Sequence, residues 1–284
     1  MGPLEQYLAA NINGQLPNGS MAWSIGADNY VNNVLVEVKV TLESKGMKLK
    51  GKSSKLLPNG YCPEMDGSPE CNAVMTQQSK AYIGILRWAL ELGRVDIVLE
   101  VSLMSSFNAL PREGHLEAIY HMFAYLATAD QHSIVFDASL PDLKPGLMVV
   151  ATDWTDFLGD VSEAIPPKMP KPRGNPVNTT CFVDANHAGN LVTCRSQTGI
   201  LLFVMKSPIV WYSKRQTSTF GSEFVAMRQA TESIEALRYK LRMFGIPIDG
   251  PTRVYGDNGA VISNSSIPTS SLTKKHNAIC YHRV

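Results

Sequence analysis

Apolar side chains recur at helical spacing through much of the first half of the chain. One stripe predicts a helix over residues 28–44, with Asp28 as N-cap and Gly46 near the C-terminal end. Its apolar face consists of Val31, Val34, Leu35, Val38 and Leu42. Similar stripes predict a helix that stops at Gly93, a second around residues 97–104, and a third that starts at Pro111. Residues 1–136 are therefore expected to be mainly helical.

The pattern changes after residue 179. Short apolar runs over 181–184, 199–204 and 208–213 predict three strands, and the short links between them favour antiparallel pairing. A helix follows over 222–244, and a fourth strand over 252–256 should lie parallel to the first. The helical stripe that faces the sheet consists of Glu223, Met227, Ala230, Ile234, Leu237 and Leu241. This is a mixed α/β sheet in the order of a ribonuclease H-type fold.

Between the two blocks the composition favours a linker. Seven prolines fall within residues 137–178, and such a composition disfavours regular structure and gives a semi-rigid spacer. We therefore expect a first domain over 1–136, a linker over 137–178 and a second domain over 179–284.

Charge and cysteine content narrow the class of protein. Residues 181–284 carry 12 Lys and Arg against 6 Asp and Glu, which is consistent with a polyanionic partner. The five cysteines are odd in number and lack C-x-x-C spacing, which argues against a disulfide framework or a zinc site. Neither a signal peptide nor a membrane-spanning apolar stretch is evident. We expect no membrane partner and an intracellular protein, in the cytoplasm or in virus-like particles.

Three acidic residues occupy positions where a carboxylate has little structural reason to be. Asp184 lies within an apolar strand, Glu223 opens the last long helix on its apolar face, and Asp257 ends the fourth strand. A carboxylate taken out of water is costly unless it is paired or binds a metal, so the three together predict a divalent-metal site. Structural alternatives remain for each. Asp184 could pair with Arg195, Glu223 could interact with the helix dipole, and Asp257 could cap the next helix.

An ordered set of motifs resembles the ribonuclease H domain of copia-type retrotransposon polyproteins. These are Phe182-Val-Asp-Ala-Asn-His-Ala-Gly, Arg195-Ser-Gln-Thr-Gly, Trp211-Tyr-Ser-Lys-Arg-Gln, Ser222-Glu-Phe and Asp257-Asn. Upstream, Tyr82-Ile-Gly-Ile-Leu-Arg-Trp, Gly93-Arg-Val-Asp-Ile and Pro111-Arg-Glu-Gly-His-Leu look like the segment that joins reverse transcriptase to that domain. The resemblance covers roughly residues 20–284. It implies that residues 1–136 are the thumb- or connection-like end of a reverse transcriptase.

The resemblance also implies a chemistry. Asp184, Glu223 and Asp257 would be the metal-binding catalytic acids, with Asn277 near the place of a fourth. They would hold two Mg²⁺ ions, or Mn²⁺, and hydrolyse the RNA strand of an RNA/DNA hybrid. The partners would be that hybrid and the rest of a reverse transcriptase polyprotein. The expected nucleic-acid-binding residues are Arg195, Ser196, Lys214, Arg215, Asn258, Lys274, Lys275 and His276.

Several departures from the family pattern keep other interpretations open. Asn186 stands where a second Asp is common, and we expect it on the opposite face of the strand from Asp184. The link between the third strand and the helix is short, and the chain stops at Val284, where the family continues into a last helix. The alternatives are a truncated, inactive element fragment that keeps the fold, and a structural module. No adjacent Asp pair occurs, so the Tyr-x-Asp-Asp polymerase site is missing and we expect no DNA synthesis.

Overall fold

The computed structural model describes residues 5–14, 22–49, 51, 53–129, 132–143, 155–159, 163–217 and 221–267. The chain divides into two compact units. The first comprises Met1–Asp137 with Asn190–Val192, and the second comprises Ala138–Gly189 with Thr193–Val284. Within the described residues, no helix is both long and apolar enough to cross a membrane.

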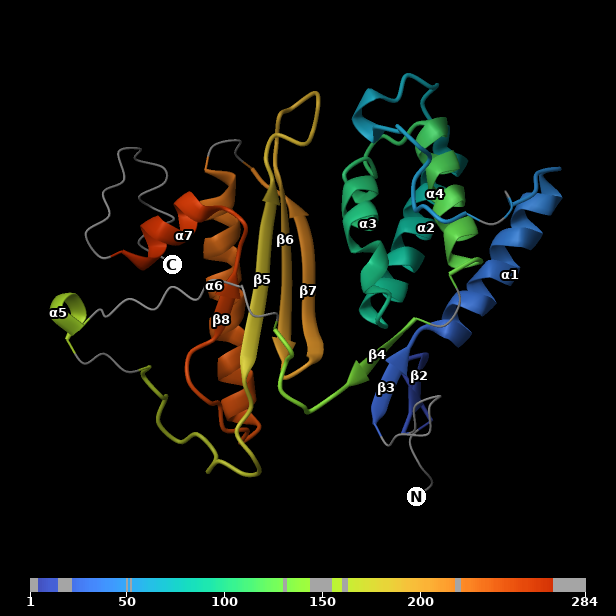
Figure 1. Ribbon diagram of the computed structural model, residues 1–284. Coiled ribbons are helices and arrows are strands. Elements are labelled where there is room, and N and C mark those ends of the chain that lie inside the picture. The colour runs from blue at the N-terminus through green and yellow to red at the C-terminus, as the bar shows by residue number, and fades with distance from the viewer. Residues whose placement is uncertain are drawn as a thin grey trace. The chain divides into compact units, whose positions relative to one another are not determined.

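The helices of the first unit are those that the apolar stripes predict (Figure 1). They are α1 (Asp28–Ser44), α2 (Ala73–Glu91), α3 (Val98–Ser105) and α4 (Glu113–Leu126), with short 3-10 turns at Pro63–Met65 and Val95–Ile97. All five stripe residues of α1 are buried in one core with side chains of α2 and α4. The expected cap is wrong, however, because Ala27 is the N-cap and Asp28 is the first helical residue.

A small antiparallel sheet in the first unit was not predicted. Its strands are β1 (Gln6–Tyr7), β2 (Ala10–Asn13), β3 (Trp23–Gly26) and β4 (Ser133–Phe136), in that order across the sheet. The pairing of β3 with β4 joins segments that are separated in sequence by all four helices. Strands of two to four residues carry too short a pattern to be recognised by alternation alone.

Two of the upstream motifs have structural roles in this unit. Arg94 is buried, and its guanidinium makes a two-pronged contact with Asp96, at 2.9 Å from Nε to Oδ1 and 2.8 Å from Nη2 to Oδ2. The Tyr125 hydroxyl donates to the same carboxylate at 2.9 Å. Because this charge pair is hydrogen-bonded on both sides, it can be accommodated next to the core.

The start of α4 explains the glycine in the motif Pro111-Arg-Glu-Gly-His-Leu. Asp66 accepts hydrogen bonds from the Tyr61 hydroxyl at 2.6 Å and from the Ser68 hydroxyl and backbone, at 2.5 and 2.8 Å. A Cβ on Gly114 would lie 2.0 Å from Asp66 Oδ2. Only glycine therefore allows the helix to begin this close to the Asp66 carboxylate.

The second unit contains the predicted mixed sheet. Its strands are β5 (Thr179–Asn186), β6 (Gln197–Val204), β7 (Ser207–Arg215) and β8 (Arg253–Tyr255), in the order β7-β6-β5-β8. The β5–β6 and β6–β7 pairs are antiparallel and the β5–β8 pair is parallel. The helices are α5 (Thr155–Leu158), α6 (Ser222–Met243) and α7 (Gly259–Ser266). The mixed α/β class is confirmed, and it is compatible with a ribonuclease H-like fold.

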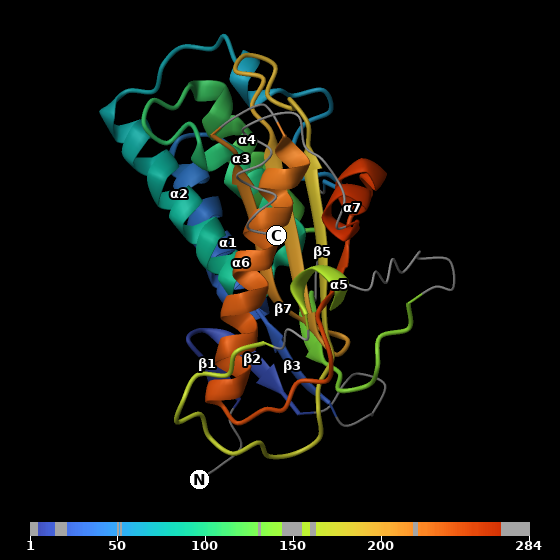
Figure 2. The same ribbon diagram turned by 90° about the vertical axis from the view of Figure 1, so that its left-hand side faces the viewer.

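Helix α6 lies along one face of this sheet (Figures 1 and 2). Its stripe residues Met227, Ala230, Ile234, Leu237 and Leu241 are all buried, and they form one core with Cys181, Val183 and Ala185 of β5. Because every second residue of β5 belongs to this core, the residues between them face the other side of the sheet.

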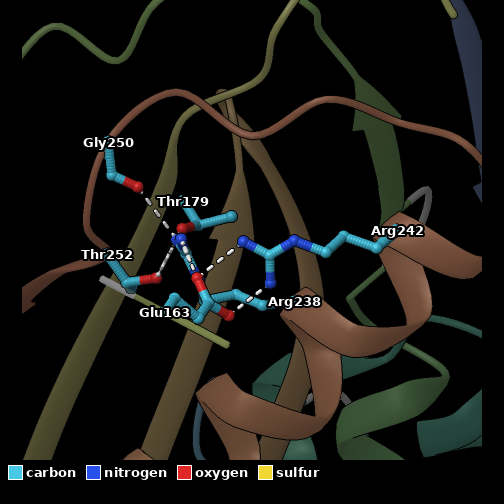
Figure 3. A network of polar contacts seen from close by, with 6 residues as sticks. All are labelled: Glu163, Thr179, Arg238, Arg242, Gly250 and Thr252. Carbon is cyan, nitrogen blue, oxygen red and sulfur yellow. Dashed lines mark hydrogen bonds and ion pairs between the residues drawn. The ribbon is translucent and has the colours of Figure 1, made fainter. Parts of the chain in front are cut away.

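Part of the proline-rich segment contacts the last turns of α6 and the residues that follow it. Val177 pairs with Ile248, and its N–H donates to the Pro247 carbonyl at 2.9 Å. Upstream, the Glu163 carboxylate accepts hydrogen bonds from the guanidinium groups of Arg238 and Arg242 (Figure 3). These bonds, above all those from Arg242, lower the pKa of Glu163 to about 2. The ion pairs hold this part of the segment against the helix.

Candidate metal centre

Asp184 is presented by the central strand of the second sheet. Along β5 the side chains of Val183 and Ala185 are buried, whereas those of Asp184 and Asn186 are exposed. The expectation that Asn186 points away from the Asp184 face is therefore wrong, because residues two apart in a strand share a face. Asp184 lies on the face opposite the α6 core.

Asp257 reaches the same face through the register of β8. Phe182 of β5 pairs with Tyr255 of β8, and their rings are stacked with centroids 5.3 Å apart. Asp184 and Asp257 each come two residues after a member of this pair, Asp184 within β5 and Asp257 just after the last residue of β8. The parallel pairing therefore carries both carboxylates to the same end of the two strands.

Glu223 arrives from the first turn of α6. The helix begins at Ser222 after Gly221, whose φ of 66° belongs to the left-handed region that glycine adopts readily. Met227, one turn further along, is buried in the core, so Glu223 lies at the start of the same core-facing stripe. Its side chain is partly buried.

These three elements bring the three acids together. One carboxylate oxygen from each of Asp184, Glu223 and Asp257 lies within 4.8 Å of the other two. Two of the three side chains, Asp184 and Asp257, are exposed, so the cluster is open to solvent on one side. This convergence is the feature that the separate sequence positions could only suggest.

The electrostatics of the cluster leave negative charge uncompensated. The pKa of Glu223 is raised to about 7, first by burial and then by the charges of Asp184 and Asp257, against a hydrogen bond with the Ala185 backbone that lowers it. Neighbouring carboxylates raise one another's pKa because like charges disfavour ionisation. A bound divalent cation would relieve this repulsion and favour loss of the proton from Glu223.

The donor set suits a hard cation. Carboxylate oxygens are the protein ligands that Mg²⁺ prefers, and Mg²⁺ usually keeps several waters, which an open cluster permits. Mn²⁺ accepts the same oxygen ligands. The residues present therefore fit a Mg²⁺ or Mn²⁺ site.

Of the structural alternatives for the three acids, the structure contradicts two and agrees with one. Asp184 and Arg195 form no ion pair, although both are among the described residues. The cap of α7 is Asn258 and not Asp257, because the Asn258 amide oxygen accepts from Ala260 N and Val261 N at 3.1 and 3.2 Å. Glu223 does lie in the first turn of α6, where the helix dipole favours a negative charge.

The expected nucleic-acid-binding residues are distributed unevenly. Arg195 and Lys214 are exposed and Arg215 is partly buried, at or next to the ends of β6 and β7 that lie beside the end of β5. Ser196 is fully buried, and its hydroxyl accepts the Ala188 N–H at 3.0 Å, so its side chain serves the fold. Asn258 caps α7. The positions of Asn277, Lys274, Lys275 and His276 lie outside the described residues.

Sequence reasoning did not predict the structural role of a group of polar residues next to the cluster. Gln216, Thr198, Ser222 and Ser196 are buried, and hydrogen bonds connect them at the end of the sheet where α6 begins. The available signal was weak. Gln216 lies three residues after the predicted strand, where it resembles any polar loop residue until the tertiary structure encloses it.

Comparison with known proteins finds similarity to the Pol polyproteins of plant transposons. It is 25% identical over 207 residues to the retrovirus-related Pol polyprotein from transposon RE1 of Arabidopsis thaliana, a match that covers 72% of this chain and 12% of that protein. The corresponding polyprotein from transposon RE2 of Arabidopsis thaliana is 22% identical with the same coverage. The polyprotein from transposon TNT 1-94 of Nicotiana tabacum is 23% identical across 99% of this chain and 18% of its own length.

No family model matches the chain, and no solved structure matches it significantly. The chain spans less than a fifth of the length of these three curated relatives. The shared sequence nevertheless extends over most of the chain, in agreement with the motifs in both units. The chain is thus related to the Pol polyproteins of copia-type retrotransposons and corresponds to a segment of them.

Proposed function

We propose that the second unit is a metal-dependent ribonuclease that hydrolyses the RNA strand of an RNA/DNA hybrid. The observation that carries this proposal is the convergence of Asp184, Glu223 and Asp257 to within 4.8 Å. Similarity to Pol polyproteins supports a role in the replication of a mobile element. The intermediates of that replication include RNA paired with DNA, which is the proposed substrate.

The proposed role of each carboxylate follows from its position. Asp184, on an inner strand of the sheet, would serve both sides of the site, and Glu223 and Asp257 would flank it. Mg²⁺, when bound there, supplies the Lewis acidity that phosphodiester hydrolysis requires. The raised pKa of Glu223 means that this carboxyl holds a proton in part of the population near pH 7, and cation binding would release it.

The substrate class follows from the chemistry of the strand to be cut. The 2′-hydroxyl distinguishes RNA from DNA at a given position, so a hybrid presents one cleavable strand to the site. Arg195, Lys214 and Arg215 carry positive charge near the same end of the sheet, which suits contacts with phosphates.

A second candidate is an inactive segment that keeps the fold. It is favoured by the short link before α6, because a carboxylate displaced by more than about 0.5 Å is poorly placed for metal catalysis. In that case the acids would still cluster, but cleavage would be absent.

Cleavage of an end-labelled RNA/DNA hybrid by the full chain, with Mg²⁺ and with Mn²⁺, separates the two candidates. We expect cleavage by the wild type, none with EDTA, and a loss of at least about 100-fold in Asp184→Asn, since this removes a shared ligand. Asp249→Asn is the matched control, because Asp249 is an exposed acid in the same unit outside the cluster. A folded wild type that cleaves with neither metal would overturn the proposal in favour of the inactive segment.

A further inference from the structure

A buried hydrogen-bond network joins the start of α6 to the end of the sheet. The Gln216 side chain is 3% exposed, and its Nε2 donates to the Ser222 carbonyl at 2.8 Å and to Thr198 Oγ1 at 3.0 Å. The Gln216 backbone N–H donates to the Ser196 carbonyl at 2.8 Å. One side chain thus contacts both the start of β6 and the first residue of the helix.

The loop after β5 is connected to the same network. Nδ1 of His187 lies 3.1 Å from Ser222 Oγ, and the Ala188 N–H donates to Ser196 Oγ at 3.0 Å. Asp184 lies three residues before His187, and Glu223 directly follows Ser222. The network therefore includes the loop that follows Asp184 and the residue that directly precedes Glu223.

The orientation of the Gln216 amide is fixed by its partners. A backbone carbonyl can only accept, so the atom that faces Ser222 O must be the NH₂ group. The other amide atom, Oε1, is buried and has no hydrogen-bond partner within the described part of the chain. A buried polar atom without a partner is costly, and its retention in a folded protein calls for an explanation. The two bonds made by Nε2 explain why Gln216 is retained despite this cost, because they hold the start of α6 in place.

We propose that Gln216 is a positioning residue: it fixes the first turn of α6 relative to β6, the strand that pairs with β5, and thereby sets the distance of Glu223 from Asp184. The inference deepens the proposed function and rests on it for its consequence in metal binding. Such support matters because outer hydrogen-bond partners of ligating residues typically change metal affinity by about 10- to 100-fold when they are removed.

Gln216→Met tests the proposal, because it keeps the length of the side chain and removes both donor contacts. Thr198→Val is a milder second variant that removes one acceptor of Nε2. Its matched control is Thr179→Val, since Thr179 is equally buried and bonds Thr252 at 2.6 Å at the opposite end of β5. All three are compared in the full chain by thermal melting, hydrogen exchange and Mn²⁺ titration calorimetry.

We expect Gln216→Met to weaken Mn²⁺ binding about tenfold and Thr198→Val to weaken it less, with no effect in Thr179→Val. Backbone amides of residues 225–228, the first ones bonded within α6, should exchange about tenfold faster in Gln216→Met, whereas those of residues 237–241 keep the wild-type rate. A purely structural residue would instead lower the melting temperature and speed exchange along the whole helix.

Unchanged exchange at residues 225–228 in both Gln216→Met and Thr198→Val would overturn the inference, as would equal loss of Mn²⁺ affinity in Thr179→Val. If Gln216→Met does not fold, Thr198→Val against Thr179→Val decides. Hydrogen exchange remains decisive even if the wild type binds no Mn²⁺ and cleaves no hybrid, an outcome that would refute the proposed function alone.

Discussion

Replacing Glu223 with Gln should stabilise the metal-free protein above neutral pH. The pKa of Glu223 is raised from 4.5 to about 7, so between these values the folded protein holds a proton that the unfolded chain has lost. The contribution of Glu223 to stability is therefore complete below about pH 4.5 and is lost as the pH rises through 7. Gln imitates the protonated carboxyl in shape and charge, and so avoids this loss.

The size of the effect follows from the pKa difference and the exposure of the side chain. A displacement from 4.5 to about 7 would correspond to about 3 kcal/mol if it were fully expressed in the free energy of unfolding. Because Glu223 is only partly buried, solvent screening reduces the expected gain to about 1 kcal/mol at pH 8. For a chain of this size that is an increase in melting temperature of about 2–4 °C.

The assay is thermal melting of wild type and Glu223→Gln at pH 4 and pH 8 in EDTA, with Asp249→Asn as an exposed-acid control. The variant should melt higher at pH 8 and close to wild type at pH 4. Added MgCl₂ should raise the melting temperature of the wild type much more than that of the variant, because binding to the folded state alone stabilises it. A variant that melts at or below wild type at pH 8 would refute the electrostatic reasoning.

Three further predictions concern the scaffold. Glu163→Gln should lower the free energy of unfolding by about 1 kcal/mol at pH 7, a value discounted because the carboxylate is 42% exposed. Near pH 2 the substitution should have little effect, because the stability that comes from a lowered pKa is lost as the pH falls through about 2. Thermal melting at the two pH values checks this. Gly114→Ala should destabilise the first unit by about 1–3 kcal/mol, measured in urea, because the new Cβ meets Asp66. Leu202→Ala, in the second core, should cost about 2–5 kcal/mol in the same measurement; a loss below 1 kcal/mol would contradict this packing.

Local periodicity was sufficient where an element buries one face along its whole length. The stripes that define α1 and α6 are buried as predicted, because repetition every three to four residues over four or more turns is hard to produce by chance. Asp184 and Glu223 could be singled out for the same reason, since at each of them a charge interrupts an apolar pattern.

The sequence by itself determined which segments form the long helices, that β5 to β8 build a mixed sheet, and which acids are candidates for a metal. Only the tertiary structure decided that those acids converge, that β4 joins the first sheet, and that Gly114 must accommodate Asp66. It alone revealed the contacts of Gln216. The physical reason is that each of these features is a short-range contact between residues far apart in the chain. Local pattern encodes which face of an element is buried, whereas packing determines what that face meets.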